Sequence, residues 1–99
     1  MLNINKALSD NKLTLALDGR VDTTTAPELE QAVKSNLDGV TELVLDFSKL
    51  NYISSAGLRV LLSSQKVMNK RGSMTITNVN DIVMEILEVT GFADILTIE

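Results

Sequence analysis

The chain has 99 residues, of which 44% are hydrophobic, and its net charge is −4. A chain of this length forms one domain, residues 1–99, with one modest core. It has no Cys and no His, which excludes disulfides, thiolate zinc sites and thiol nucleophiles and removes the commonest general base and metal ligand. We therefore expect no enzyme, no metal site and no cofactor. The negative net charge also disfavours binding to nucleic acid.

Membrane insertion is not expected either. No apolar run approaches the roughly 20 residues that a helix needs to span a bilayer. The first ten residues, MLNINKALSD, lack the apolar core of a signal peptide. These features favour a cytoplasmic protein.

The first third of the chain predicts two strands and a helix. Residues 3–8 are weakly apolar and fit an edge strand, and Leu13, Leu15 and Leu17 alternate with other residues as in a half-buried strand. Residues 18–19, Asp-Gly, predict the turn that ends this strand. A helix should follow Thr25, with Glu28 completing a capping box. We expect this helix to end at another Asp-Gly pair, residues 38–39.

The rest of the chain alternates strands and helices. Residues 41–47 predict a strand whose consecutive Leu43, Val44 and Leu45 indicate burial on both faces and a central position. A turn over 48–55 leads to a helix that Gly72 ends, and a strand over 73–79 follows. Asn80 or Asp81 can cap a third helix, and the chain closes with a short tail from residue 92.

The expected fold class is α/β. The order of elements is strand, strand, helix, strand, helix, strand, helix and a short C-terminal tail. This alternation predicts helices packed against a mixed sheet of four to five strands, with parallel pairs joined by crossovers. In such sheets functional groups gather in the loops after the carboxyl ends of strands. The turn over 48–55 is one of those loops.

The sequence Ser54-Ser55-Ala56-Gly57 stands at the start of the second predicted helix. Serine is a common helix cap, because its oxygen accepts a backbone N–H. A serine nucleophile is disfavoured, since the chain has no His to act as its base and no G-x-S-x-G motif. A phosphate acceptor fits better, because the free N–H groups of a helix N-terminus and its dipole stabilise an anion.

Three segments resemble the STAS domains of bacterial anti-sigma factor antagonists. The segment LVLDFSKLNYISSAGLRVLL resembles the family signature, in which an apolar strand ends in Asp and leads through a turn to Asp, Ser or Thr, a small residue, Gly and Leu. The segment LDGRVDTTTAPELEQAV is similar to the second strand, loop and first helix of the family, and VMEILEVTGFADIL is similar to its closing helix. The resemblance covers nearly the whole chain.

The resemblance implies a phosphorylation site at Ser55, because Gly57-Leu58 aligns with the Gly-Leu of the family. Ser54 takes the place usually held by Asp and is the second choice as acceptor. Asp22 matches a loop Asp near the serine turn, although it could equally be a simple turn residue. The expected partner-binding residues are Asp22, Thr23, Thr24, Ser54, Ser55, Ala56, Gly57 and Arg59.

The family also implies a mechanism of partner switching. The unmodified domain would bind an anti-sigma factor that is also a serine kinase, and this binding would free a sigma factor for transcription. Phosphorylation of Ser55 would end the binding, and a separate serine phosphatase would restore it. The alternative is a STAS module that is not phosphorylated and serves as an adaptor in another signalling or transport complex. Ser54, in place of the usual Asp, supports this alternative.

Overall fold

The computed structural model describes residues 2–99, which form four strands, three α-helices and one 3₁₀ turn. The strands are β1 (Leu2–Ser9), β2 (Lys12–Val21), β3 (Glu42–Ile53) and β4 (Ser73–Thr77). The helices are α1 (Ala26–Lys34), α2 (Ser55–Arg71) and α3 (Asp81–Val89), and the 3₁₀ turn spans Phe92–Asp94. The order of strands and helices confirms the predicted one.

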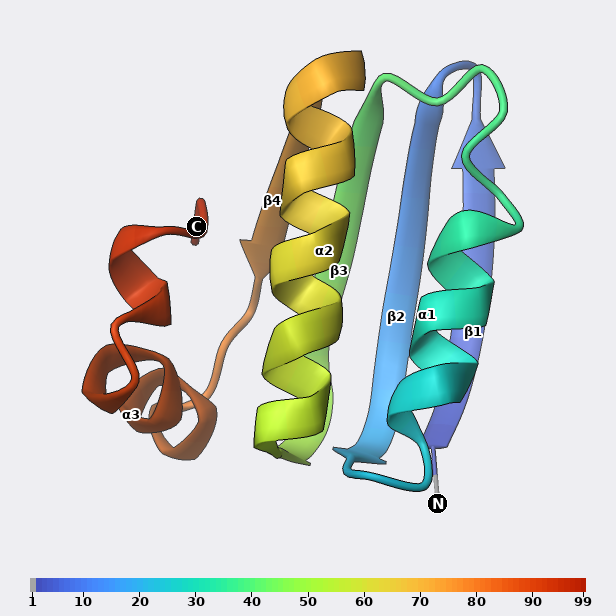
Figure 1. Ribbon diagram of the computed structural model, residues 1–99. Coiled ribbons are helices and arrows are strands. Elements are labelled where there is room, and N and C mark those ends of the chain that lie inside the picture. The colour runs from blue at the N-terminus through green and yellow to red at the C-terminus, as the bar shows by residue number, and fades with distance from the viewer. Residues whose placement is uncertain (1) are drawn as a thin grey trace.

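The four strands form one mixed sheet in the order β1-β2-β3-β4. β1 and β2 are an antiparallel hairpin, whereas β2 pairs with β3 and β3 with β4 in parallel. The helices α1 and α2 make the crossovers between the parallel strands, and both lie on the same face of the sheet (Figure 1). A single bridge between Ile76 and Ile98 attaches the C-terminal tail to β4. The α/β class and the mixed sheet are therefore as predicted.

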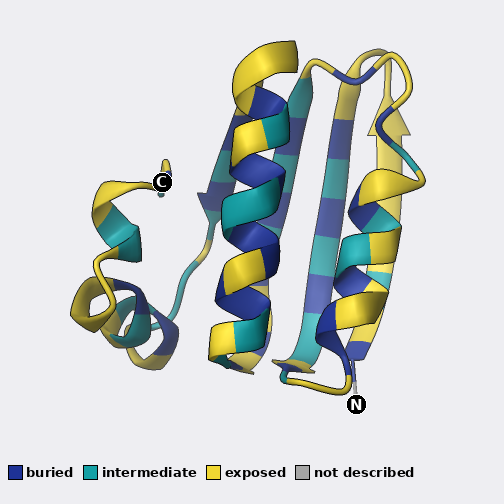
Figure 2. Ribbon diagram, viewed as in Figure 1, coloured by how far each residue is buried: buried dark blue, intermediate teal, exposed yellow. Residues whose placement is uncertain are grey.

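The core lies between the sheet and the two crossover helices. Along β2, β4 and the first half of β3, buried residues alternate with residues that are half-buried or exposed, whereas β1 is mostly exposed (Figure 2). Leu43 and Leu45 of β3 are fully buried, whereas Val44 between them is only half-buried. The expectation that β3 is central is confirmed, but burial on both of its faces is wrong. The reason is topological, since both crossover helices cover one face and leave the other partly open.

Two predicted turns are in fact strand. The Asp18-Gly19 pair lies inside β2, and residues 48–53 continue β3. In the pairing of these strands, Ala16 lies opposite Asp46 but Asp18 lies opposite Lys49, and a second shift follows Gly19. Each shift is a β-bulge that adds a residue to β3, and Gly19, with φ 119°, takes the backbone conformation that such an irregularity favours.

The helix caps agree only in part with the sequence. Asn80 caps α3 as expected, its Oδ1 accepting from the Val83 N–H at 2.9 Å. Thr25 is the N-cap of α1, but its side chain makes no cap hydrogen bond, so the predicted capping box is wrong. Its hydroxyl instead accepts from the backbone N–H of Asp22 and donates to the carbonyl of Arg20, at 2.8 and 2.9 Å.

The helix α1 ends at Lys34, earlier than the Asp-Gly pair at 38–39 that was expected to end it. Residues 35–41 form the loop that leads into β3. Within residues 2–99, no helix has the length and apolar character needed to cross a membrane.

Candidate functional site

The candidate site is built where β2, β3 and α2 meet. Ser54 follows the last residue of β3, and its N–H donates to the carbonyl of Val21 at 2.8 Å, which fixes the start of α2 to the end of β2. Ser54 is the N-cap, with an extended backbone, and its Oγ accepts from the Gly57 N–H at 3.5 Å. Ser54 is half-buried, and its side chain has a structural role as the cap of α2.

Ser55 is the first residue of α2 and is exposed. Within residues 2–99, its hydroxyl makes no hydrogen bond to another side chain or to the backbone. The first N–H groups of a helix have no partner in the helix, and together they form the positive end of its dipole. The two neighbouring serines therefore differ: Ser54 caps the helix, and Ser55 presents a free hydroxyl beside an electropositive helix end.

Gly57 is the residue that brings α2 close to the ends of the two strands. It is buried, and a Cβ placed on it would lie 2.6 Å from Cγ1 of Ile53 and 2.6 Å from Cγ1 of Val21. No side chain fits there without movement of these neighbours. Gly57 was predicted as a partner-binding residue, but the structure places it beneath the exposed surface, which it supports by allowing this close approach.

Asp22 organises the loop between β2 and α1. Its Oδ1 accepts from the Thr24 hydroxyl at 2.7 Å and from the backbone N–H groups of Thr24 and Thr25 at 3.0 and 3.1 Å. The hydrogen bond from the Thr24 hydroxyl, followed by that from the Thr25 N–H, lowers the pKa of Asp22 from 3.8 to about 2. The interpretation of Asp22 as a turn residue is therefore well supported, and its hydrogen bonds fix the exposed Thr24 in the loop.

The pKa of Asp22 leads to a prediction. A carboxylate whose pKa is lower in the folded than in the unfolded state stabilises the fold above the unfolded value and loses this effect as the pH falls through the folded value. The free energy of unfolding should therefore lose this contribution between pH 3.8 and about 2. In Asp22→Asn the corresponding slope should be absent. Urea unfolding of both proteins across this range measures it; equal slopes would contradict the hydrogen-bonded carboxylate.

The structure adds two residues that the sequence did not suggest. Arg20 of β2 lies opposite Tyr52 of β3, and its guanidinium carbon is 4.9 Å from the centre of the tyrosine ring. Arg20 Nε is also 3.7 Å from Oδ2 of Asp22. The pair depends on the two bulges, which set the register of these strands, so no sequence pattern could have found it. It places an exposed cation and an aromatic ring beside the Asp22 loop.

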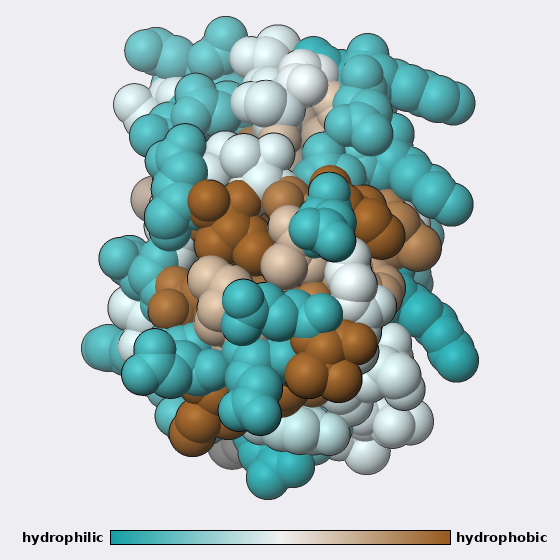
Figure 3. Space-filling model, turned by 90° about the vertical axis from the view of Figure 1, so that its left-hand side faces the viewer, coloured by the Kyte–Doolittle hydropathy of each residue, from teal (hydrophilic) through white to brown (hydrophobic). Residues whose placement is uncertain are grey.

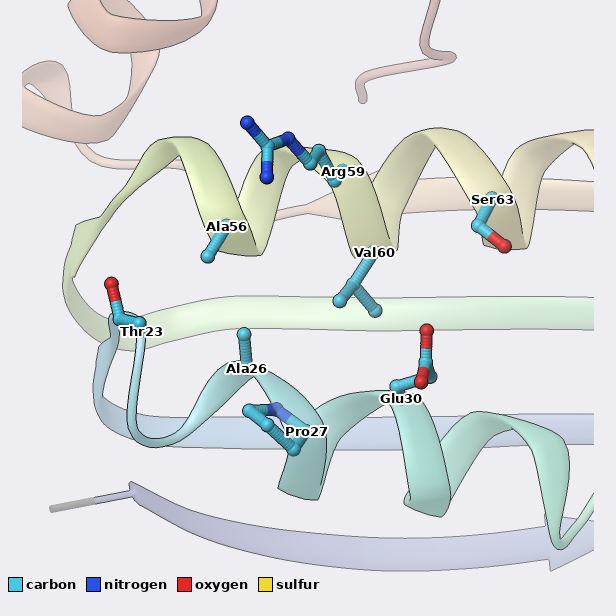
Figure 4. A pocket seen from close by; sticks show the side chains of 8 residues that line it. All are labelled: Thr23, Ala26, Pro27, Glu30, Ala56, Arg59, Val60 and Ser63. Atoms are coloured by element: carbon cyan, nitrogen blue, oxygen red, sulfur yellow. The ribbon is translucent and has the colours of Figure 1, made fainter.

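A shallow groove of about 390 Å³ runs between α1 and α2, and we call it the α1–α2 groove (Figure 4). It brings together three predicted partner-binding residues, Thr23, Ala56 and Arg59. In Figure 4, Arg59 points away from α1, so it forms the outer rim on α2. Five further residues line the groove that the sequence did not suggest as a site, although the small and apolar ones are spaced along the two helices: Ala26, Pro27, Glu30, Val60 and Ser63.

Asp46 lies apart from this groove. Its Oδ1 accepts from the backbone N–H of Ser48 at 2.9 Å and from the Asn78 side chain at 3.1 Å. The hydrogen bond from Asn78, then that from Ser48, lowers the pKa of this carboxyl below its usual value. Asp46 thus stabilises the first bulge of β3 and has a structural role. Residues 2–99 contain no group of three or more side chains placed to hold a metal ion.

Comparison with known proteins identifies the family of this chain. The family model described as "Mlab, STAS domain" matches residues 4–97. The chain belongs to the STAS domain family. The Bordetella bronchiseptica protein named "Putative anti-sigma factor antagonist BtrV" is 35% identical to this STAS domain over 91 residues, which is 90% of the chain and 78% of that relative.

Solved STAS structures have the same fold. An anti-sigma factor antagonist from Mycobacterium paratuberculosis superimposes with a TM-score of 0.89 at 22% identity, covering 99% of this chain and 85% of the other. The Bacillus protein SpoIIAA in its phosphorylated form gives a TM-score of 0.74 at 13% identity, covering 100% of this chain and 91% of the other. The relatives and structural neighbours of this STAS domain thus include anti-sigma factor antagonists, and a sulfate transporter family protein from Wolinella succinogenes is also among the structural neighbours.

Proposed function

We propose that this STAS domain is an anti-sigma factor antagonist that is switched by phosphorylation of Ser55. In this proposal the unmodified domain binds an anti-sigma factor in the cytoplasm and so releases a sigma factor. The anti-sigma factor acts as the serine kinase that modifies Ser55 with ATP, and a separate phosphatase reverses the modification. The observation that carries the proposal is the exposed hydroxyl of Ser55 at the N-terminus of α2, which has no hydrogen-bond partner among residues 2–99.

The different structural positions of the two serines support Ser55, and not Ser54, as the phosphate acceptor. The Ser54 oxygen is the helix cap, whereas the Ser55 side chain is exposed and can enter the active site of a kinase. Asp and Ser are both strong N-cap residues. Ser54 therefore performs the structural role that Asp would have at this position, and the departure from the family pattern does not by itself argue against phosphorylation.

The surface around Ser55 has the composition of a docking site. The α1–α2 groove combines the apolar Ala26, Val60 and Ala56 with the charged Glu30 on α1 and with Arg59 at its rim. Apolar centres with polar rims are typical of protein interfaces. Ser55 itself does not line the groove, but it directly precedes Ala56, which does. A phosphate on Ser55 would therefore place negative charge at the edge of a partner seated there.

The test is phosphorylation by the cognate anti-sigma factor. The protein is incubated with this kinase and ATP, and its intact mass is measured. We expect one added phosphoryl group in the wild type and in Ser54→Ala, and none in Ser55→Ala. A phosphate that persists in Ser55→Ala and is lost in Ser54→Ala would reverse the assignment of the two serines.

The same variants separate capping from modification. Removing a serine cap costs about 0.5–2 kcal/mol, and the 3.5 Å hydrogen bond of Ser54 places it at the lower end. We expect Ser54→Ala to lower the free energy of unfolding by about 0.5–1 kcal/mol, and Ser55→Ala to change it little. Chemical denaturation measures both. No added mass in any variant, together with partner binding that Ser55→Asp does not alter, would instead favour the adaptor that is not phosphorylated.

A further inference from the structure

The outer side of α3 carries two parallel stripes of side chains. Ile82, Ile86 and Val89 follow one another at helical spacing, and the exposed fractions of Ile82 and Val89 are 64% and 80%. One position before each of them stands an acid, namely Asp81, Glu85 and Glu88. We call these six residues the acidic–apolar stripe. Four of them, Ile82, Glu85, Ile86 and Val89, line a shallow depression of about 290 Å³ together with Thr90. The side of the molecule that carries α3 shows hydrophobic surface between hydrophilic patches (Figure 3).

Only Ile86 of the stripe is partly buried against the core; the exposed Ile82 and Val89 do not serve it. On the inner side of α3, Val83 and Leu87 are fully buried and so already attach the helix to the domain. The N-cap Asn80 adds a hydrogen bond to the carbonyl of Leu50 at 2.7 Å. The exposed Ile82 and Val89 are therefore not needed to hold α3 in place. Exposed apolar rows with polar borders are typical of interaction surfaces.

Charge indicates what kind of partner fits. Residues 72–99 contain five acidic side chains and no Lys or Arg, so all nine basic residues lie before them. No ion pair to the acids of the stripe is found within residues 2–99. A bilayer with anionic lipids would be repelled by these carboxylates. A polypeptide with apolar residues beside Lys or Arg would bury the apolar row and pair with the acidic row.

A second copy of the chain fits less well. In an antiparallel pairing of two identical stripes, the same flanks face each other, so carboxylates would oppose carboxylates. In a parallel pairing, the acidic row would face the other flank of the partner helix, where Val83 and Leu87 are buried and no cation is available. Neither arrangement gives the acids a partner of opposite charge.

We propose that the acidic–apolar stripe of α3 is a second docking surface, which binds an amphipathic helical segment of another protein whose apolar row is bordered by Lys or Arg. The surface is separate from Ser55, because it shares no residue with the serine turn or with the lining of the α1–α2 groove. It would allow the domain to remain attached to one protein while its other surface exchanges partners.

The probe is a synthetic helical peptide with Leu at i, i+4 and i+7 and Lys on the flanking positions, and its matched control carries Glu in place of Lys. Binding to ¹⁵N-labelled protein is followed by chemical-shift changes. We expect the Lys peptide to perturb the amides of α3 and to bind about tenfold or more tightly than the Glu peptide at low salt, where exposed charges are least screened. Added salt should reduce this difference.

Two variants identify the surface. Ile82→Ser/Val89→Ser should weaken binding of the Lys peptide about tenfold or more, and Glu85→Lys/Glu88→Lys should reverse the preference between the peptides. All four positions are exposed, so the fold should be retained. The variant Ser55→Glu should leave binding unchanged, which keeps this test separate from the proposed switch. Equal binding of the two peptides, shift changes confined to the α1–α2 groove, dimerisation lost in Ile82→Ser/Val89→Ser, or binding to anionic vesicles would each overturn the proposal.

Discussion

Replacing Ser55 with aspartate is expected to weaken binding of the anti-sigma factor by about 100-fold or more, because a like charge or a buried unpaired charge at an interface costs several kcal/mol. The added carboxylate would sit at the N-terminus of α2, where the helix dipole tolerates it. Ser55 is exposed, and its hydroxyl makes no hydrogen bond to any group in the described part of the chain, residues 2–99. The fold should thus persist while the binding is lost. Titration calorimetry of the variant with the anti-sigma factor measures the loss.

The matched control is Ser9→Asp. It makes the same change of residue and charge at the end of β1, next to the hairpin and at the opposite end of β2 from the serine turn. We expect this control to bind like the wild type, and Ser55→Ala to bind nearly as well. If Ser9→Asp weakened binding as much as Ser55→Asp, the effect would come from net charge alone and not from a docking surface at α2.

The regular parts of the fold could be predicted from the sequence because their periodicity is strong. The alternation of Leu13, Leu15 and Leu17 correctly predicted β2. Gly72, which is the C-cap of α2, correctly predicted where that helix ends. The expected central position of β3 was also right. These features depend on local rules, namely side-chain alternation in strands and capping in helices, which a sequence displays directly.

The parts that the sequence did not predict depend on pairing between distant residues. The bulges of β3 place polar residues such as Ser48 and Asn51 within a strand, where they look like a turn. Those bulges also set Arg20 against Tyr52. Likewise, the α1–α2 groove forms because both crossover helices lie on one face of the sheet, which no local pattern specifies. The serine turn of the candidate site could therefore be predicted from the sequence. The Arg20–Tyr52 pair and the α1–α2 groove beside it could not.

Gly57→Ala is expected to destabilise the domain by about 1–3 kcal/mol, the usual cost of overpacking a core. In an ordinary helix position, the same change stabilises by about 1 kcal/mol, because glycine is a poor helix former. The sign should be reversed here, since the new Cβ would lie 2.6 Å from Cγ1 of both Ile53 and Val21. Neither neighbour can move easily, because both are buried in the core. Chemical denaturation of the variant gives the sign and the size of the change.

A double-mutant cycle with Val21→Ala tests the cause of this loss. Truncating Val21 removes one of the two Cγ1 atoms that the new Cβ would meet, so the double variant should be more stable than the sum of the two single changes allows. Ser55→Ala, which is in the same turn of α2 but exposed, is the control and should stay within about 0.5 kcal/mol of the wild type. Additive losses would show that Gly57 acts through its backbone alone. If Gly57→Ala were instead more stable than the wild type, α2 would not approach the strands this closely. The placement of Ser55 at the end of the sheet would then be wrong.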